Sequence, residues 1–143
     1  MADDFQQNLI VPDIVEAAAN GVEYMPVVFP GFSWHNLQST QGGSYPLNQI
    51  PRNGGRFYWR QVYNAIAAGS TMIYGAMFDE VDEGTAMYKL APTAAEMPAQ
   101  GSFVALDIDG DALPSDWYLR LADEAGKMLR ADIPLSSPIP ITP

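Results

Sequence analysis

The hydrophobic pattern of this chain is dominated by two almost unbroken apolar runs, at residues 22–29 and 71–78. Runs of this kind are typical of strands that are covered on both faces, as in a parallel sheet. Between them, residues 56–68 carry apolar side chains at helical spacing, and Gly69 follows where a C-terminal cap belongs. The order strand, helix, strand predicts two parallel strands joined by a right-handed helical crossover.

Three more segments surround this unit. A short helix is expected over residues 13–20, with Asp13 as its cap and Gly21 as its end. A long loop is expected over residues 32–55, and loops of this length in a compact domain are usually functional or mobile. The apolar stretch at residues 103–108 predicts a third strand.

The C-terminal part predicts one more helix, to about residue 129, with Ser115 as its N-cap after Pro114. Its core face would consist of Tyr118, Leu121, Ala122, Ala125, Met128 and Leu129. Residues 131–143 are rich in proline, which predicts an extended, non-helical tail. The predicted fold class is therefore α/β, with parallel strands and flanking helices over residues 1–130. Two or three parallel strands leave both sheet edges open, so they do not form a stable sheet alone.

Composition narrows the classes of partner and cofactor. The chain has 143 residues, enough for one domain, and a net charge of −10 with only seven Lys and Arg. Such a surface repels nucleic acid and anionic membranes, so neither is an expected partner. The absence of cysteine and the single histidine disfavour a metal site, and no cofactor is expected. No signal peptide or membrane span is recognisable, so the compartment is not assigned.

The most unusual segment follows the second apolar run, where Asp79, Glu80, Asp82 and Glu83 come together before Gly84. Like charges repel and burial disfavours ionisation, so folded proteins rarely gather carboxylates at the end of a core strand. The usual reasons for such a cluster are acid/base chemistry, a cation or a sugar.

Three motifs in this order resemble the last part of the (β/α)8 barrel of glycoside hydrolase family 99, which contains endo-α-mannosidases and endomannanases. Gly31 and Phe32 follow a strand in VVFPGFSWHN, Arg52 begins the helix-opening segment RNGGRFYWR, and Phe78 begins FDEVDEGT. The family motif after the last barrel strand is Phe-Asn-Glu-Trp-His-Glu-Gly-Thr. Family 71 barrels and bacterial proteins named xylosidase/arabinosidase are related.

The resemblance extends over about residues 13–130 and implies a partial TIM-type barrel: the last two strands with their helices, roughly half or less of a typical barrel of about 250 residues. It implies that Glu80 is the base that assists attack by the substrate's own 2-hydroxyl group. Glu83 would be the acid that protonates the leaving oxygen. Two carboxyls three residues apart on a turning loop can flank one glycosidic bond, which is the arrangement that such hydrolysis needs.

The sequence departs from the family motif beside these two residues. Asp79 replaces asparagine, and Val81 and Asp82 replace tryptophan and histidine. These changes alter the charge of the loop and remove an aromatic platform. The residues that the family supplies from earlier strands have no counterpart in this chain, so the isolated chain is predicted to be inactive.

The roles of several other side chains can be interpreted in two ways. Trp34 and His35 could line a sugar site, or Trp34 could pack the loop against the core, and the sequence favours neither. Arg52 could hold a site carboxylate or a substrate hydroxyl, with Asp79 as a further substrate contact. The slightly preferred alternative for Arg52 is a surface charge that flanks the helix. The alternating acids at residues 107–111 resemble a calcium loop but lack its final glutamate, which favours turn formation.

These observations support two functional hypotheses. The first is the C-terminal fragment of a glycoside hydrolase-like barrel, with carbohydrate as substrate and Glu80 and Glu83 as the reacting pair. The alternative is a non-catalytic half-barrel module that associates with itself or with a missing half and so covers its open edges.

Overall fold

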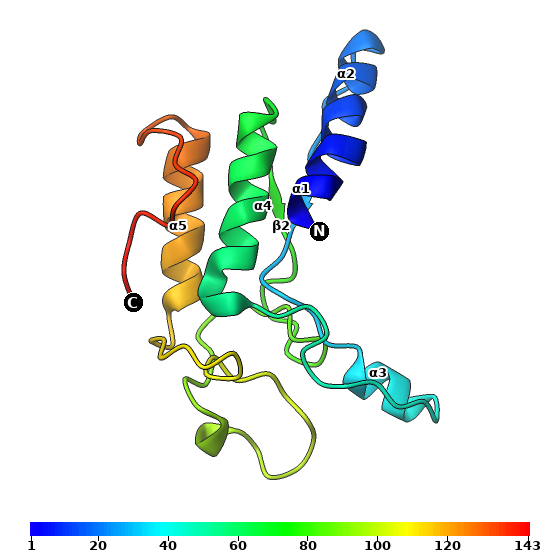
Figure 1. The fold of residues 1–143 in the computed structure, drawn as a ribbon, viewed down its shortest axis with the longest axis vertical. Coiled ribbons are helices and arrows are strands. Elements are labelled where there is room, and N and C mark those ends of the chain that lie inside the picture. The colour runs from blue at the N-terminus through cyan, green and yellow to red at the C-terminus, as the bar shows by residue number, and fades with distance from the viewer.

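The computed structural model describes residues 1–143 and consists of helices, two short strands and long connecting loops (Figure 1). In chain order the elements are α1 (Ala2–Phe5), a π-helical turn (Gln6–Ile10), α2 (Val11–Ala19), β1 (Val27–Val28), α3 (His35–Thr40), a 3-10 turn (Asn53–Gly55), α4 (Arg56–Ala67), β2 (Tyr74–Gly75), a 3-10 turn (Ala94–Glu96) and α5 (Trp117–Leu129). Figure 1 shows α5, α4 and the N-terminal helix side by side, with the long loops at one end and α3 projecting away.

The central unit is the predicted parallel pair with its helical crossover. β1 pairs with β2 in parallel, with Val27 opposite Tyr74 and Val28 opposite Gly75, and α4 connects the two strands. Gly69 adopts a left-handed φ of 96° just after α4, as expected for a helix-ending glycine. The strands are much shorter than predicted, because each has only the other as a pairing partner.

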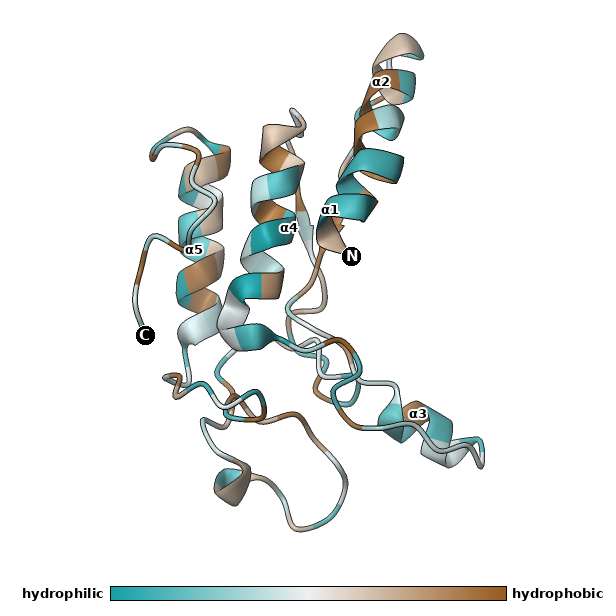
Figure 2. Cartoon of the chain, viewed as in Figure 1, coloured by the Kyte–Doolittle hydropathy of each residue, from teal (hydrophilic) through white to brown (hydrophobic).

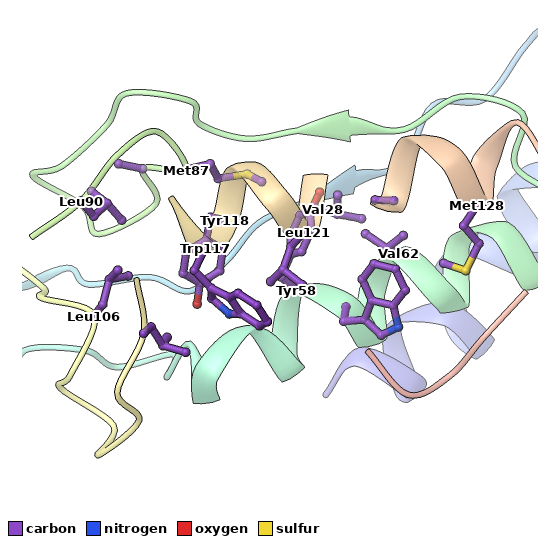
Figure 3. Close-up of a cluster of buried hydrophobic side chains, with 14 residues drawn as sticks. Val28, Tyr58, Val62, Met87, Leu90, Leu106, Trp117, Tyr118, Leu121 and Met128 are labelled. Carbon is purple, nitrogen blue, oxygen red and sulfur yellow. The ribbon is translucent and has the colours of Figure 1, made fainter. Parts of the chain in front are cut away.

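The core lies between this pair and the helices (Figure 3). Val28 of β1, Tyr58 and Val62 of α4, and Tyr118 and Leu121 of α5 belong to one buried cluster. Most of the predicted core face of α5 is buried as expected, whereas Ala122 and Leu129 are only partly buried. The helices therefore cover one face of the strand pair.

The opposite face of the pair is open, which corrects the expectation that both strands are covered on both faces. Val27 is 48% exposed and its partner Tyr74 is 46% exposed. Met25, which shares this face by the alternation of a strand, is 50% exposed. Nothing in this chain lies over these residues.

The N-terminal helix begins well before the predicted position. It is helical from Ala2 through Ala19, so Asp13 lies inside a helix and does not cap one, although Gly21 ends it with a φ of 67°. Its first turns are hydrophilic (Figure 2), so apolar periodicity could not reveal them. They are held by polar contacts with α4, including the Gln6 side chain, which donates to the Asn64 carbonyl over 3.0 Å.

Three other expectations about local structure are wrong. Residues 103–108 form no strand; Val104, Ala105 and Leu106 are buried within an irregular segment that ends in a turn. The predicted loop 32–55 contains the short helix α3. Finally, Asp116 and not Ser115 occupies the N-cap of α5, and it makes no side-chain capping bond.

The C-terminal residues 131–143 contain no helix or strand. They run back along the helices, where the Trp59 indole donates to the Ser136 carbonyl over 3.1 Å and Arg120 donates to the Thr142 carbonyl over 2.7 Å. Ile139 packs against the core cluster. No helix of the chain has the length and apolar character needed to cross a membrane.

Candidate functional site

The acidic loop that follows β2 is a compact turn. Residues 81–84 form the turn itself, and Gly84 has a left-handed φ of 67°. The Glu80 carboxylate accepts a hydrogen bond from the Asp82 amide over 2.8 Å, and the Glu80 carbonyl accepts one from the Thr85 amide over 3.1 Å. Glu80 is therefore fixed at the start of the turn, with its side chain folded over it.

The loop that follows β1 is bonded directly to this turn. The Ser33 amide donates to the Glu83 carbonyl over 2.7 Å, and the Asn36 side chain donates to the Asp82 carbonyl over 3.1 Å. Parallel strands place the loops that follow them at the same end of the sheet, and these contacts join the two loops there. The loop after β1 is therefore held against the backbone of the acidic turn.

The buried side chain of Arg52 supports the acidic turn. Its terminal nitrogens donate to the carbonyls of Gly84 over 2.8 Å and Ala86 over 3.1 Å. The guanidinium lies over the Tyr118 ring, 4.8 Å from its centroid. Burial lowers the pKa of Arg52, since removal from water disfavours the charged form.

Arg52 is thus not the surface charge that the sequence slightly favoured, because 2% exposure leaves almost nothing of it in solvent. Its contacts give it a positioning role beneath the backbone that carries Glu83. Gly31 makes this possible, because a Cβ atom there would come within 2.7 Å of the Arg52 side chain.

An aromatic group forms the outer wall of the candidate site. The rings of Phe32, Trp34 and Tyr45 meet edge to face, with 5.9 Å between successive centroids. Trp34 and Tyr45 are each 42% exposed, so part of each ring is open to solvent. His35 Nδ1 lies 2.6 Å from the Tyr45 carbonyl and ties the start of α3 to the returning loop. Trp34 therefore packs within the loop and also presents a ring outward.

The four carboxylates of the acidic loop have no ion-pair partner in this chain. Asp79 and Asp82 are exposed, and Glu80 and Glu83 are partly buried. The nearest buried cation, Arg52, uses its terminal nitrogens on backbone carbonyls. The charge of this loop is therefore left uncompensated and available to a ligand.

The second set of acids, at residues 107–111, holds other loops together. Asp107 accepts from the Ala94 amide over 3.1 Å, and Asp109 accepts from the Asn48 side chain over 2.7 Å and from the Asn53 amide over 2.7 Å. This agrees with the predicted turn-forming role. No group of three or more His, Asp or Glu side chains is arranged to hold a metal ion.

Sequence reasoning missed several residues that build the site. Asn36 bridges the carbonyls of Asp82 and Ser102, and Tyr45 completes the aromatic group. Polar or aromatic residues in a long loop give no indication of their partners, so only the high aromatic content of residues 32–45 pointed to this region.

Comparison with known proteins gives a structural likeness only. No protein-family model matches the chain, and no curated protein matches it in sequence. The structure is similar to that of the GH99 endo-alpha-mannosidase from Bacteroides thetaiotaomicron in complex with bis-tris propane, with a TM-score of 0.66 and 22% sequence identity. The match covers 85% of this chain and 35% of that chain, so this chain spans about a third of that enzyme's length.

At this level of identity the likeness concerns the fold. The neighbour is a TIM-barrel enzyme, and the parallel strand pair with its flanking helices is compatible with one part of such a barrel. The chain therefore resembles, in its fold, one part of that barrel.

Proposed function

We propose that this chain forms the C-terminal part of a glycoside hydrolase-like barrel and supplies its acid/base pair. Glu80 acts as the base and Glu83 as the acid in cleavage of a glycosidic bond. The observation that carries this proposal is the contact between the two strand-end loops. The loop that carries the exposed aromatic rings is bonded to the turn that carries Glu80 and Glu83, at the strand end where barrel enzymes keep their chemistry.

The chemistry assigns a different task to each residue. Glu80 removes a proton from the sugar hydroxyl that attacks the anomeric carbon, and Glu83 donates a proton to the departing oxygen. Trp34 and Tyr45 offer ring faces on which a pyranose can stack. Arg52 holds the turn, and a direct substrate contact is not proposed for it, since its side chain is buried.

Binding by the acidic loop can be tested on the chain itself. The probe is bis-tris propane, an amine polyol that the neighbouring enzyme's structure contains. We expect its titration to shift the amide resonances of residues 79–85, and the double variant Glu80→Gln/Glu83→Gln to lose these shifts. Glu16→Gln, an exposed carboxylate on α2, is the control and should keep them. Equal shifts in both variants would remove the support for a site at this loop.

Catalysis is tested in a complete barrel that contains this segment. Glu83→Gln should abolish cleavage of substrates with poor leaving groups and spare activated aryl glycosides, because these need little protonation. Glu80→Gln should impair both, since the attacking hydroxyl still needs a base. An equal effect of Glu83→Gln on both substrates would contradict the assignment, and so would robust hydrolysis by the isolated chain.

One observation favours the second candidate, a non-catalytic module that associates with itself. Several large apolar side chains are well exposed, among them Val15 at 67%, Val22 at 62% and Phe78 at 59%. Large apolar side chains that are exposed in this number are typical of an interface when they adjoin one another. Light scattering would show a dimer or larger assembly at all accessible concentrations if self-association is the function, and a monomer would exclude it.

A further inference from the structure

The outer edge of β2 carries unpaired backbone groups. The amides of Tyr74 and Ala76 donate to carbonyls on the β1 side, those of Pro26 and Val28, over 3.0 and 2.9 Å. In a parallel strand successive residues direct their backbone groups to opposite edges, so the Gly75 amide and carbonyl point away from β1. The sheet has only two strands, and Gly75 is exposed. The backbone groups of this edge are therefore free to form hydrogen bonds with another strand.

An apolar cavity lies along the same edge. It has a volume of about 280 Å³ and is walled by Gly75 of β2 and the preceding Ile73, by Ala122, Gly126 and Leu129 of α5, and by Tyr58 of α4. No charged side chain lines it. A strand added at this edge would direct every second side chain into the cavity, and only apolar side chains would be stable there.

The exposed strand face continues across the same edge. Val27 and Tyr74 lie side by side on it and are about half exposed, although both are large and apolar. A third strand would extend this face and give Tyr74 a second neighbour. One additional strand beside β2 would therefore pair the free edge, fill the cavity and extend the open face.

We propose that the outer edge of β2 receives a third parallel β-strand from a barrel-type (β/α) segment, with apolar side chains on its helix-facing side. The chain aligns with only 35% of a barrel enzyme, and in a barrel every strand has two neighbours. A second copy of this chain is disfavoured as the occupant, because each copy carries a net charge of −10. The proposal depends on the fold likeness and not on the chemistry of Glu80 and Glu83.

The test uses the full chain and a short synthetic peptide of alternating valine and lysine, which places valine on one face and positive charge on the other. Titration should slow hydrogen exchange of the Gly75 amide and shift the resonances of Ile73 and Ala122. A spin label on the peptide's N-terminus should broaden resonances near Met72, two residues before β2, as a parallel strand requires. Broadening near Phe78 would indicate an antiparallel strand and overturn the proposal.

Two substitutions separate edge pairing from non-specific adsorption. Gly75→Pro removes the free amide and leaves the donors of Tyr74 and Ala76 to β1, so peptide affinity should fall about tenfold or more. Gly75→Ala keeps the amide and should bind as the unmodified chain does. Ala122→Leu should weaken binding by filling the cavity, whereas Ala112→Leu, on an exposed loop residue, should not.

Three results would overturn the proposal. These are no peptide binding, equal binding by Gly75→Pro and Gly75→Ala, or a stable pair of copies joined edge to edge through β2 that excludes the peptide. Circular dichroism of each variant shows whether it is folded, and Ala122→Leu keeps the test decisive if Gly75→Pro fails to fold.

Discussion

The two faces of the β1–β2 pair are built from the same kinds of residue and have opposite environments. Val28 is fully buried beneath α4 and α5, whereas its neighbour Val27 is 48% exposed. Ile73, just before β2, packs against the core cluster, whereas Tyr74 of β2 is 46% exposed. The chain therefore covers one face of its strand pair with helices and leaves the other face exposed.

This asymmetry also explains where the candidate site lies. The helix-covered side of the pair provides the packing that fixes Arg52, and Arg52 in turn holds the acidic turn. The carboxylates and the aromatic wall stand in the two loops that follow the strands. Stability is therefore expected to depend on the covered face, and association on the open one.

The largest effect is expected for Leu121→Ala, on the covered face. Leu121 is fully buried in the core cluster, so truncation removes transfer free energy and leaves a cavity. We expect a loss of about 2–5 kcal/mol in urea unfolding. Leu135→Ala, at a position that is 49% exposed, is the control and should change stability by less than about 0.5 kcal/mol. Similar losses in both would mean that the cluster is not the stabilising core.

The second largest loss of stability is expected for Arg52→Met, because the Arg52 side chain connects the covered face to the acidic turn. The substitution leaves the Gly84 and Ala86 carbonyls without their donor, which should cost about 1.5–3 kcal/mol. Hydrogen exchange should also become faster in residues 79–85. Arg130→Met, whose side chain is 63% exposed, is the matched control and should leave this loop unchanged. Unaltered exchange in the Arg52 variant would disprove the positioning role.

Gly84→Ala tests how tightly the acidic turn is packed. Both Gly84 and Gly110 have left-handed φ angles, 67° and 84°, so alanine at either position costs about 1–2 kcal/mol in backbone strain. A Cβ at Gly84 would also meet a Val104 methyl group at 2.9 Å, whereas Gly110 has no neighbour within 4 Å. Thermal unfolding should therefore show a larger loss for Gly84→Ala. Equal losses would mean that Val104 moves aside freely.

Much of this architecture could be predicted from the sequence, because it depends on local pattern. The apolar runs, the periodicity of α4 and α5 and the position of Gly69 predicted the parallel unit. The meeting of the two loops followed from parallel strands placing their C-terminal ends together. The extent of strand pairing could not be predicted, since it depends on partners that the pattern does not specify.

The structural features that the sequence did not predict depend on contacts between residues that are far apart in the chain. The first turns of the N-terminal helix are polar and are held by Asn64 and Arg60 of α4. The burial of Arg52 requires Tyr118, which is remote in sequence, to cover it. Within residues 103–108, Val104 lies against the turn at Gly84 and Leu106 belongs to the core cluster, so their apolar character reflects packing and not a strand.

A smaller effect is expected for Asp3→Asn, at the far edge of the covered side. Hydrogen bonds from Arg60 and then Asn64 lower the pKa of the Asp3 carboxyl below 3.8. A lowered folded-state pKa stabilises the fold above the unfolded value and loses that contribution as pH falls through the folded value. The variant should lose about 0.5 kcal/mol or less at pH 7, since the pair is exposed, and nothing at strongly acidic pH. A difference that persists in acid would exclude this carboxylate as the cause.

The smallest effect is expected for Val27→Thr, and Val28→Thr is its matched comparison on the covered face. The two positions are adjacent, and both residues are β-branched before and after substitution. Val28→Thr buries a hydroxyl without a partner and should cost about 1–3 kcal/mol. Val27→Thr changes a half-exposed side chain and should stay within about 0.5 kcal/mol in dilute unfolding experiments. If the loss at Val27 grows with protein concentration, the open face is covered by another copy, because only association makes stability depend on concentration. If it grows only when the valine–lysine peptide is bound, the face belongs to a sheet that a third strand extends.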